Sequence, residues 1–389
     1  MGTVMSADDV RPAVAARAGG SADDSALPTP FLVIDVTTVM SQYAALREAL
    51  PAATIYYAVK ANPLPEVVQA LVRAGAHVDV ASAPEIEQCL ALGIPAARMS
   101  FGHTVKKAAA VAAAHAVGID QFTCDSAGEL EKIARHAPGA RVTVRLLTLG
   151  AGAEWPLSRK FGCDPAMVFD LMVQARALGL RPWGISFHVG SQQTDPGQWD
   201  QPIALAARLF DLLGRQGIGL DTLNLGGGFP ARYQTAVPPI GLYGAAIEQS
   251  LARHFGRRRP QVVVEPGRYL VADAGTIEAE IVLIAQKSHG DDTRWVYLDC
   301  GKFGGLAETM DEAIKYRIEV PGRSGRLTPV ILAGPTCDSA DILYERTPCR
   351  LPADIETGDR VRILSAGAYT HTYASVGFNG FAPLTAIAR

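Results

Sequence analysis

Two residues of opposite charge end apolar, β-rich runs of this chain. Lys60 closes TIYYAVK, and Glu265 closes QVVVE. A lysine that is partly desolvated at a strand end has a lowered pKa, and its neutral amine can form a Schiff base with an aldehyde. A carboxylate at the end of an apolar strand needs a partner with a proton or a positive charge. Each has a plain structural alternative, because Lys60 can reach solvent and Glu265 can form a salt bridge with Arg268.

Other strand ends are polar as well. Three glycines, Gly226, Gly227 and Gly228, follow TLNL and let backbone N–H groups approach an anion, or else form a plain tight turn. They do not match G-x-G-x-x-G, which argues against a dinucleotide-binding fold. His188 ends GISFH, where it is either a core histidine or a flat ring lying against a flat cofactor. The remaining polar strand-end residues are Asp79, Ser82, Arg145, Ser191 and Arg268.

A thiol and a carboxylate lie side by side in GPTCDSADILYE, residues 334–345. Cys337 is either a proton donor or a small buried hydrophobe. Asp338 next to it indicates a polar loop, and its carboxylate can accept a cationic ammonium group.

The elements that must position these residues alternate regularly. Eight β-branched or aromatic runs (TIYYAV, HVDV, RMSF, IDQFTC, RVTVRLL, GISFHV, TLNL and QVVVE) alternate with Ala- and Leu-rich stretches of helical period, such as 65–74, 84–92, 105–117, 127–136 and 165–178. This α/β pattern predicts a (β/α)8 barrel, with an open doubly wound sheet as the alternative. In a barrel the carboxyl ends of all strands meet on one face, so the polar residues are expected to gather there.

After Asp273 the pattern changes to strands joined by Gly, Pro and Asp turns, which predicts a C-terminal all-β domain, sandwich-like or barrel-like. The run PFLVIDV at 30–36 is expected to pair with that domain. We therefore predict a barrel over 36–272, a β-domain over 28–35 plus 273–389, and a disordered leader over 1–27.

Composition narrows the function classes. Charged residues make up 19% of the 389 residues with a net charge of -3 and no basic cluster, which argues against nucleic-acid and membrane partners and favours small-molecule chemistry. No segment is apolar and long enough to span a bilayer or act as a signal peptide. The six cysteines form no C-x-x-C pair, so neither a metal site nor a disulfide framework is expected, and a cytoplasmic location is favoured.

Seven motifs occur in the order YYAVKANP, FHVGSQ, LNLGGGFP, EPGRYLVADAG, GKFGGLAET, GPTCDSADILY and GAYTHTYASVGFNGF. Together they resemble the pyridoxal-phosphate-dependent decarboxylases of basic amino acids, above all the ornithine decarboxylases and their bacterial lysine/ornithine relatives, which share a fold with alanine racemase. The resemblance covers residues 28–389.

The resemblance implies pyridoxal 5'-phosphate as cofactor, with Lys60 forming its Schiff base. It implies that His188 stacks on the cofactor ring and that Glu265 pairs with the ring nitrogen and keeps it protonated. The phosphate is then held by Ser191, Gly226, Gly227, Gly228, Arg268 and Tyr369, and the cofactor is further lined by Asp79, Arg145 and Gly267.

For the substrate, the resemblance implies that Asp338 accepts the distal ammonium group and that Cys337 reprotonates Cα. Phe378 lies at the same pocket, together with Asp311 or Glu312, with Glu308 close by in the sequence. The family forms homodimers whose active sites are shared across the interface. The expected reaction is decarboxylation of L-ornithine to putrescine and CO2, with some activity on lysine.

Several alternatives stay open. Another basic amino acid or diaminopimelate is a possible substrate. A racemase is disfavoured by Glu265, because racemases of this fold have an arginine at the ring nitrogen. A non-catalytic regulatory homologue is disfavoured, because Lys60, His188, Glu265 and Arg268 are all present.

Overall fold

The computed structural model describes residues 27–148, 150, 152–155 and 160–389. The predicted leader therefore lies outside the described residues, apart from Leu27. The chain divides into two units: a first of residues up to Thr37, Arg232–Thr235 and Ala272–Arg389, and a second of Thr38–Ala231 and Ala236–Val271. No helix among the described residues has the length and apolar character needed to cross a membrane.

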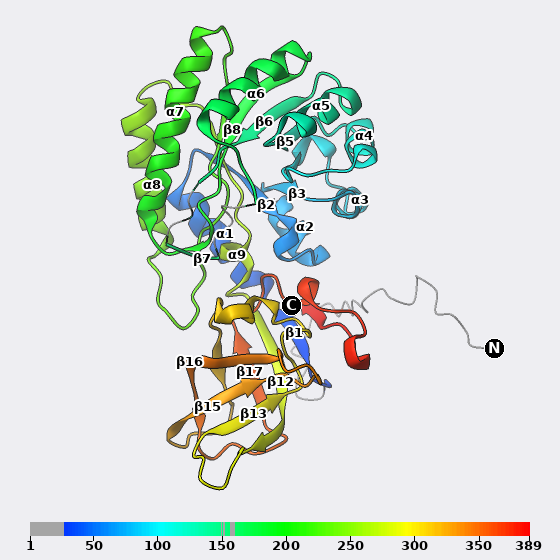
Figure 1. The fold of residues 1–389 in the computed structure, drawn as a ribbon, viewed down its shortest axis with the longest axis vertical. Helices are drawn as coiled ribbons and strands as arrows, with labels where there is room; N and C mark the ends of the chain where they lie inside the picture. Colours follow the sequence, from blue (N-terminus) through cyan, green and yellow to red (C-terminus); the bar gives the residue numbers. More distant parts are fainter. Residues whose placement is uncertain (1–26, 149, 151, 156–159) are drawn as a thin grey trace, which may run out of the picture. The chain divides into compact units, whose positions relative to one another are not determined.

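The second unit contains a closed barrel of parallel strands, as predicted, so the doubly wound alternative is wrong (Figure 1). Around the barrel the strands are β2 (Ala53–Ala58), β3 (His77–Val80), β4 (Met99–Phe101), β5 (Gln121–Cys124), β6 (Arg141–Arg145), β8 (Arg181–Ser186), β10 (Thr222–Asn224) and β11 (Gln261–Val264), and β11 pairs with β2. They coincide with the eight predicted runs. Their buried side chains, including Val78, Phe122 and Val144, fill the core.

A helix follows each of the barrel strands, and one further helix, α1, precedes the first of them. They are α1 (Val36–Ala49), α2 (Pro65–Arg73), α3 (Ala83–Ala91), α4 (Ala108–Ala116), α5 (Ala127–His136), α6 (Pro165–Ala177), α7 (Asp200–Arg215), α8 (Ile240–Phe255) and the short α9 (Arg268–Val271). Local signals set several starts: α6 begins with Pro165 after Asp164, whose side chain accepts the N–H of Met167. A small antiparallel pair is formed by β7 (Ala153–Trp155), which follows β6 in the chain, and β9 (Ser191–Gln193), which follows β8.

The first unit is built around an eight-stranded sheet. Its strands are β1 (Phe31–Ile34), β12 (Gly275–Ala285), β13 (Arg294–Leu298), β14 (Arg317–Glu319), β15 (Leu327–Ala333), β16 (Ile342–Pro352), β17 (Arg360–Leu364) and β18 (Thr385–Ala388). The long strand β12 organises the sheet, because its first half pairs with β1 and β17 and its second half with β13. The run at 30–36 therefore joins this sheet through β1, between β12 and β18.

The sequence interpretation of 334–345 as one loop is only partly right. The loop ends at Asp341, and β16 begins at Ile342. This strand has a single paired neighbour, β15, and carries Pro348 and Pro352, which strands tolerate at an edge. Its charged residues and prolines hide the alternation that marks a strand.

Candidate active site

Lys60 lies in a short 3-10 turn, Val59–Ala61, directly after β2. The turn is fixed by Asn62, whose side chain accepts the N–H of Leu64 at 3.1 Å and whose carbonyl accepts the hydroxyl of Tyr57 at 2.7 Å. The amine of Lys60 lies 4.0 Å from Asp79 Oδ2, and its side chain is 53% exposed. The turn after β2 thus places the accessible amine of Lys60 beside the buried acid Asp79.

Asp79, on β3, is 5% exposed and accepts the backbone N–H of Gly102 at 3.1 Å. Burial raises its pKa well above the ordinary value, the negative charge of Glu265 raises it further, and the ammonium of Lys60 opposes the shift. Asp79 is therefore a buried acid that holds a proton more readily than an ordinary aspartate does.

Glu265 immediately follows β11. Its Oε1 accepts a hydrogen bond of 2.5 Å from the amide of Asn224, the last residue of β10. Arg268, the proposed salt-bridge partner in the structural alternative, is buried and donates to Ser191 Oγ from Nε at 3.3 Å and from Nη2 at 3.1 Å. Arg268 and Ser191 thus form a pair of donors suited to a phosphate.

The three glycines after β10 form a turn that admits no side chain. Gly226 and Gly228 have φ of 66° and 99°. A Cβ on Gly226, Gly227 or Gly228 would collide with the carbonyl oxygen of Phe187, Glu265 or Gly190, respectively. The backbone here is packed closely enough to form the kind of cradle that an anionic group occupies.

His188 follows β8 beside this turn. Its Nδ1 accepts the N–H of Gly190 at 3.0 Å, and its Nε2 would lie 3.3 Å from a Cβ on Gly227. Burial lowers the pKa of His188 well below its usual value, and the positive charges of Arg145 and Lys60 add to this effect. The imidazole is therefore neutral at pH 7, which suits a ring that stacks rather than one that titrates.

Arg145 ends β6, and its guanidinium lies 5.0 Å from the ring centroid of Phe161. Burial lowers its pKa, whereas Glu265, Asp125 and Asp79 oppose the change. These interactions place the Arg145 charge at the same end of the barrel as Asp79 and Glu265.

Sequence reasoning missed Asn224 and Glu85. Ser82 caps the start of α3 by accepting the N–H of Glu85, and Glu85 accepts the N–H of Ala81, just before the cap, at 2.7 Å. Burial raises the pKa of Glu85, and its hydrogen bond from Ala81 and the charge of Lys60 lower it, so this acid interacts electrostatically with the candidate amine. The S-x-x-E spacing was a readable signal for the cap, but nothing in it indicates Lys60.

The other candidates lie in the first unit. Cys337 is exposed, so its interpretation as a small buried hydrophobe is wrong; its N–H donates to Asn379 Oδ1 at 2.9 Å. Asp338 is exposed and accepts the N–H of Ala340 at 2.9 Å. The buried Asp341 fixes the loop by accepting the N–H of Lys302 at 2.7 Å and the hydroxyl of Thr336 at 2.8 Å.

Asp311 and Glu312 differ sharply. Asp311 is exposed, whereas Glu312 is buried and accepts the N–H groups of Glu345, Arg346 and Thr347 at 2.9, 2.8 and 2.6 Å. Burial opposes ionisation of Glu312, but hydrogen bonds from the Thr347 side chain and from these backbone groups outweigh it and lower its pKa to about 2. The carboxylate of Glu312 is thus already hydrogen-bonded to the backbone of β16.

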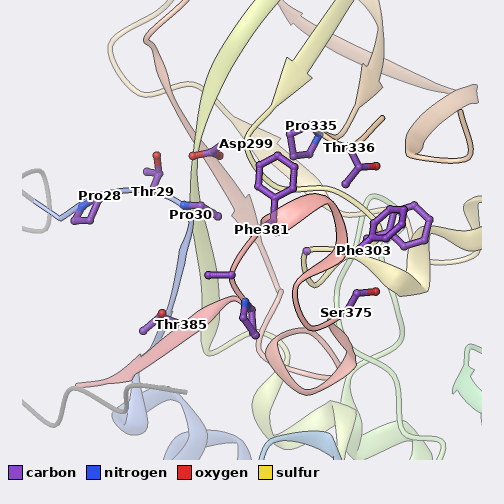
Figure 2. Close-up of a pocket in the computed structure, with 14 residues that line it drawn as sticks. Pro28, Thr29, Pro30, Asp299, Phe303, Pro335, Thr336, Ser375, Phe381 and Thr385 are labelled. Carbon is purple, nitrogen blue, oxygen red and sulfur yellow. The ribbon is translucent and has the colours of Figure 1, made fainter. Parts of the chain in front are cut away.

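Phe378 lines a cavity of about 240 Å³ in the first unit, next to the residues that precede Cys337. Figure 2 shows Phe303, Phe381, Pro335 and Thr336 around this cavity. The rings of Phe378 and Phe303 pack with centroids 4.8 Å apart. Tyr369 is half-buried and has a φ of 56°, which is uncommon for a residue with a side chain.

No cluster of three or more His, Cys, Asp or Glu side chains that could hold a metal ion occurs in the described part of the chain. The residues at the barrel end do fit a pyridoxal phosphate. The fit consists of an accessible amine, a neutral flat ring, an anchored carboxylate, and a glycine cradle beside a buried arginine.

Comparisons with known proteins agree with this chemistry. Residues 36–272 match the family model described as pyridoxal-dependent decarboxylase, pyridoxal binding domain. The lysine/ornithine decarboxylase of Selenomonas ruminantium is 34% identical, over 91% of this chain and 88% of that protein. The ornithine decarboxylase of Mus musculus is 32% identical, over 90% and 78%.

A solved structure, the lysine/ornithine decarboxylase of Vibrio vulnificus complexed with cadaverine, superimposes with a TM-score of 0.85 at 33% identity. It covers 94% of this chain and 96% of that chain. The predicted family, enzyme class and cofactor are confirmed by these matches. The chain belongs to the pyridoxal-dependent decarboxylases, within the group of ornithine/lysine decarboxylases, which are lyases that use pyridoxal 5'-phosphate.

Proposed function

We propose that this enzyme removes the α-carboxylate of L-ornithine to give putrescine and CO2, with lysine as a second substrate. The observation that carries the reaction type is the anchored carboxylate of Glu265, held at 2.5 Å by Asn224 beside the glycine turn. An acid at this position stabilises a protonated ring nitrogen, whereas an arginine, as in racemases of this fold, leaves the nitrogen neutral.

We assign the residues that bind the cofactor as follows. Lys60 would bond the aldehyde carbon, the neutral ring of His188 would contact the cofactor ring, and Glu265 would accept a hydrogen bond from the ring nitrogen. Bound pyridoxal phosphate would supply an electron sink for the bond that loses CO2. Ser191, Gly226, Gly227, Gly228, Arg268 and Tyr369 would hold the phosphate, and Asp79, Arg145 and Gly267 would line the cofactor further.

Asp79 has a separate role in this proposal. Burial and the charge of Glu265 raise the pKa of Asp79, whose carboxyl group lies 4.0 Å from the amine of Lys60. Asp79 would therefore be placed to exchange a proton with this amine.

The substrate's distal ammonium group is assigned to Asp338, because its carboxylate is exposed and accepts a backbone hydrogen bond from Ala340, which leaves it accessible to a ligand. Of the two further acids, Asp311 is the better candidate, since Glu312 already accepts three backbone N–H groups. Phe378 forms an apolar wall of the pocket. One methylene separates ornithine from lysine, and a pocket distinguishes such a difference by only about 1–3 kcal/mol.

Cys337 is assigned as the donor that returns a proton to Cα after CO2 leaves. Its thiol is exposed, and its backbone is tied to Asn379, so the loop presents the sulfur in a defined place. A thiol is a suitable donor at a carbon centre, because it releases its proton more readily than a hydroxyl group does.

The first unit also carries a surface that suits a second copy of the chain. Five large apolar side chains are exposed there: Met310 (40%), Tyr373 (47%), Val376 (66%), Phe378 (37%) and Phe381 (43%). Exposed apolar side chains in such number mark interaction surfaces. We assign these exposed apolar residues to a homodimer in which Cys337 and Asp338 of one subunit complete the site of the other.

A subunit-mixing experiment tests this assignment. Lys60→Ala and Cys337→Ala subunits are each inactive or slow alone, but a heterodimer of the two has one complete site if the sites are shared. An equal mixture should regain about a quarter of the wild-type activity. A mixture no more active than its components overturns the shared site.

We also assign the enzyme to the cytoplasm, supported by its six cysteines, all of which are free thiols. Fractionation of the source cells with an antibody against the chain tests this location. Recovery outside the cytoplasmic fraction would contradict it.

The substrate assignment is tested by CO2 release from L-ornithine, L-lysine, L-arginine and meso-diaminopimelate with added pyridoxal phosphate, together with the mass of each product. We expect the largest kcat/KM on ornithine and a smaller one on lysine. A preference for meso-diaminopimelate would reject the assignment of Asp338, and interconversion of enantiomers without CO2 release would reject the decarboxylase.

A further inference from the structure

Asn224, the last residue of β10, connects two parts of the candidate cofactor site. Its Nδ2 donates to Glu265 Oε1 at 2.5 Å, and its Oδ1 accepts the N–H of Gly226 at 2.9 Å. The N–H of Glu265 in turn donates to the carbonyl of Gly226 at 2.8 Å. Three hydrogen bonds therefore join the acid assigned to the ring nitrogen with the turn assigned to the phosphate.

The partners of Asn224 fix the orientation of its amide. In the reversed orientation, Oδ1 would face a carboxylate oxygen and the NH2 group would face the N–H donor of Gly226. Asn224 is 7% exposed, so a reversed amide would bury two unsatisfied contacts. An amide N–H is also a donor at every pH, which an aspartate in its place is not.

We propose that Asn224 is a positioning residue that determines how Glu265 meets the cofactor. Asn224 occupies Oε1 and leaves Oε2 for the ring nitrogen, and it holds this oxygen at a fixed separation from the phosphate turn. The inference rests on the proposed function, because that function assigns Glu265 to the ring nitrogen and Gly226 to the phosphate.

The proposal is tested by equilibrium binding to the apoenzyme, followed through quenching of its intrinsic fluorescence. Two probes are compared: pyridoxal phosphate and its 1-deaza analogue, in which a carbon replaces the ring nitrogen. Wild type should bind pyridoxal phosphate more tightly than the analogue. Asn224→Ala and the isosteric Asn224→Asp should each lose about tenfold in affinity for pyridoxal phosphate and change little for the analogue.

A matched control is Gln216→Glu, which changes an exposed amide to an acid at the end of α7 and should bind both probes as wild type does. If Asn224→Ala fails to fold, Asn224→Asp carries the test, because it preserves the shape of the side chain.

The outcomes separate this inference from the proposed function. Wild type without any preference for pyridoxal phosphate over the analogue would reject the assignment of Glu265 to the ring nitrogen, and Asn224's role with it. If both Asn224 variants keep the wild-type preference for pyridoxal phosphate over the analogue, the role of Asn224 is overturned while the assignment of Glu265 stands. An equal loss for both probes would show a general structural role and would overturn it as well.

Discussion

The barrel end and the loops of the β-sheet unit hold their candidate residues in opposite ways. At the barrel end the functional groups contact partners on neighbouring strands, as Glu265 contacts Asn224 and as Arg268 contacts Ser191. In the β-sheet unit, Cys337 and Asp338 are exposed, and only the backbone around them is tied down. The residues proposed to hold the cofactor are thus organised within one barrel. The residues proposed for the substrate are exposed on the β-sheet unit.

The largest effect that tests the barrel half is Lys60→Ala. Removing the amine should abolish the visible absorbance that pyridoxal phosphate acquires with a lysine, and should lower kcat by about a thousandfold or more. An absorbance spectrum of the cofactor-supplemented protein checks this. Lys107→Ala, an exposed lysine before α4, serves as the control and should keep the band. A Lys60→Ala protein that retains it would place the Schiff base elsewhere.

Glu265→Gln should have the next largest effect. The substitution keeps the shape but removes the negative charge that supports a protonated ring nitrogen, so we expect kcat to fall by about a hundredfold while KM changes little. Steady-state kinetics of CO2 release on ornithine measure both. Unchanged kcat would show that the anchored acid of the barrel is structural, and the contrast between the two regions would disappear.

Cys337→Ala probes the exposed half. Without the thiol, reprotonation at Cα should slow by about tenfold to a hundredfold. Where the proton is added to the cofactor instead, hydrolysis would release an aldehyde and leave the amino group on the cofactor, so part of the product should have a changed mass. Mass spectrometry of the products detects this. Cys349→Ala, a buried cysteine of β16, is the comparison and should give putrescine alone. Identical products from Cys337→Ala and wild type would remove the thiol from the mechanism.

Asp338→Asn should mainly weaken binding. Loss of a charge-assisted hydrogen bond to the distal ammonium should raise KM for ornithine by about tenfold, with a smaller change in kcat. Asp354→Asn, which alters a turn acid bonded to Gly325, controls for loss of one charge in the same unit. If KM is unchanged, the distal amine is bound by another acid, and Asp311 becomes the first candidate.

Much of the barrel could be predicted from the sequence, because parallel strands buried on both faces are continuous apolar runs. Lys60 and Glu265 stood out for the same reason, as charges at the ends of such runs. Asn224 and Glu85 did not, since their importance depends on partners that only the closed barrel brings near. The bond from Asn224 to Glu265, for example, spans 41 residues of sequence. Edge strand β16 was missed because its prolines and charges obscure the period of two.

Glu312→Gln gives the smallest expected effect on catalysis. It tests whether this acid of the β-sheet unit stabilises the fold instead of binding the substrate. The folded pKa of Glu312 is about 2, below the ordinary value of a glutamate, so its ionised form stabilises the fold above that ordinary value. We expect the variant to lower the free energy of unfolding at pH 7 by about 2–3 kcal/mol. The deficit should shrink as the pH falls from about 5 to about 2, because protonation removes the same advantage from wild type.

Urea denaturation followed by circular dichroism at several pH values measures this difference. Glu356→Gln removes an exposed acid that is paired with Arg323, and it should cost less than about 0.5 kcal/mol at any pH. KM for ornithine should stay within about twofold of wild type, because the three backbone N–H groups of β16 already occupy the Glu312 carboxylate. A raised KM with unchanged stability would instead assign Glu312 to the substrate, and would mean that β16 releases this carboxylate when the ammonium group binds.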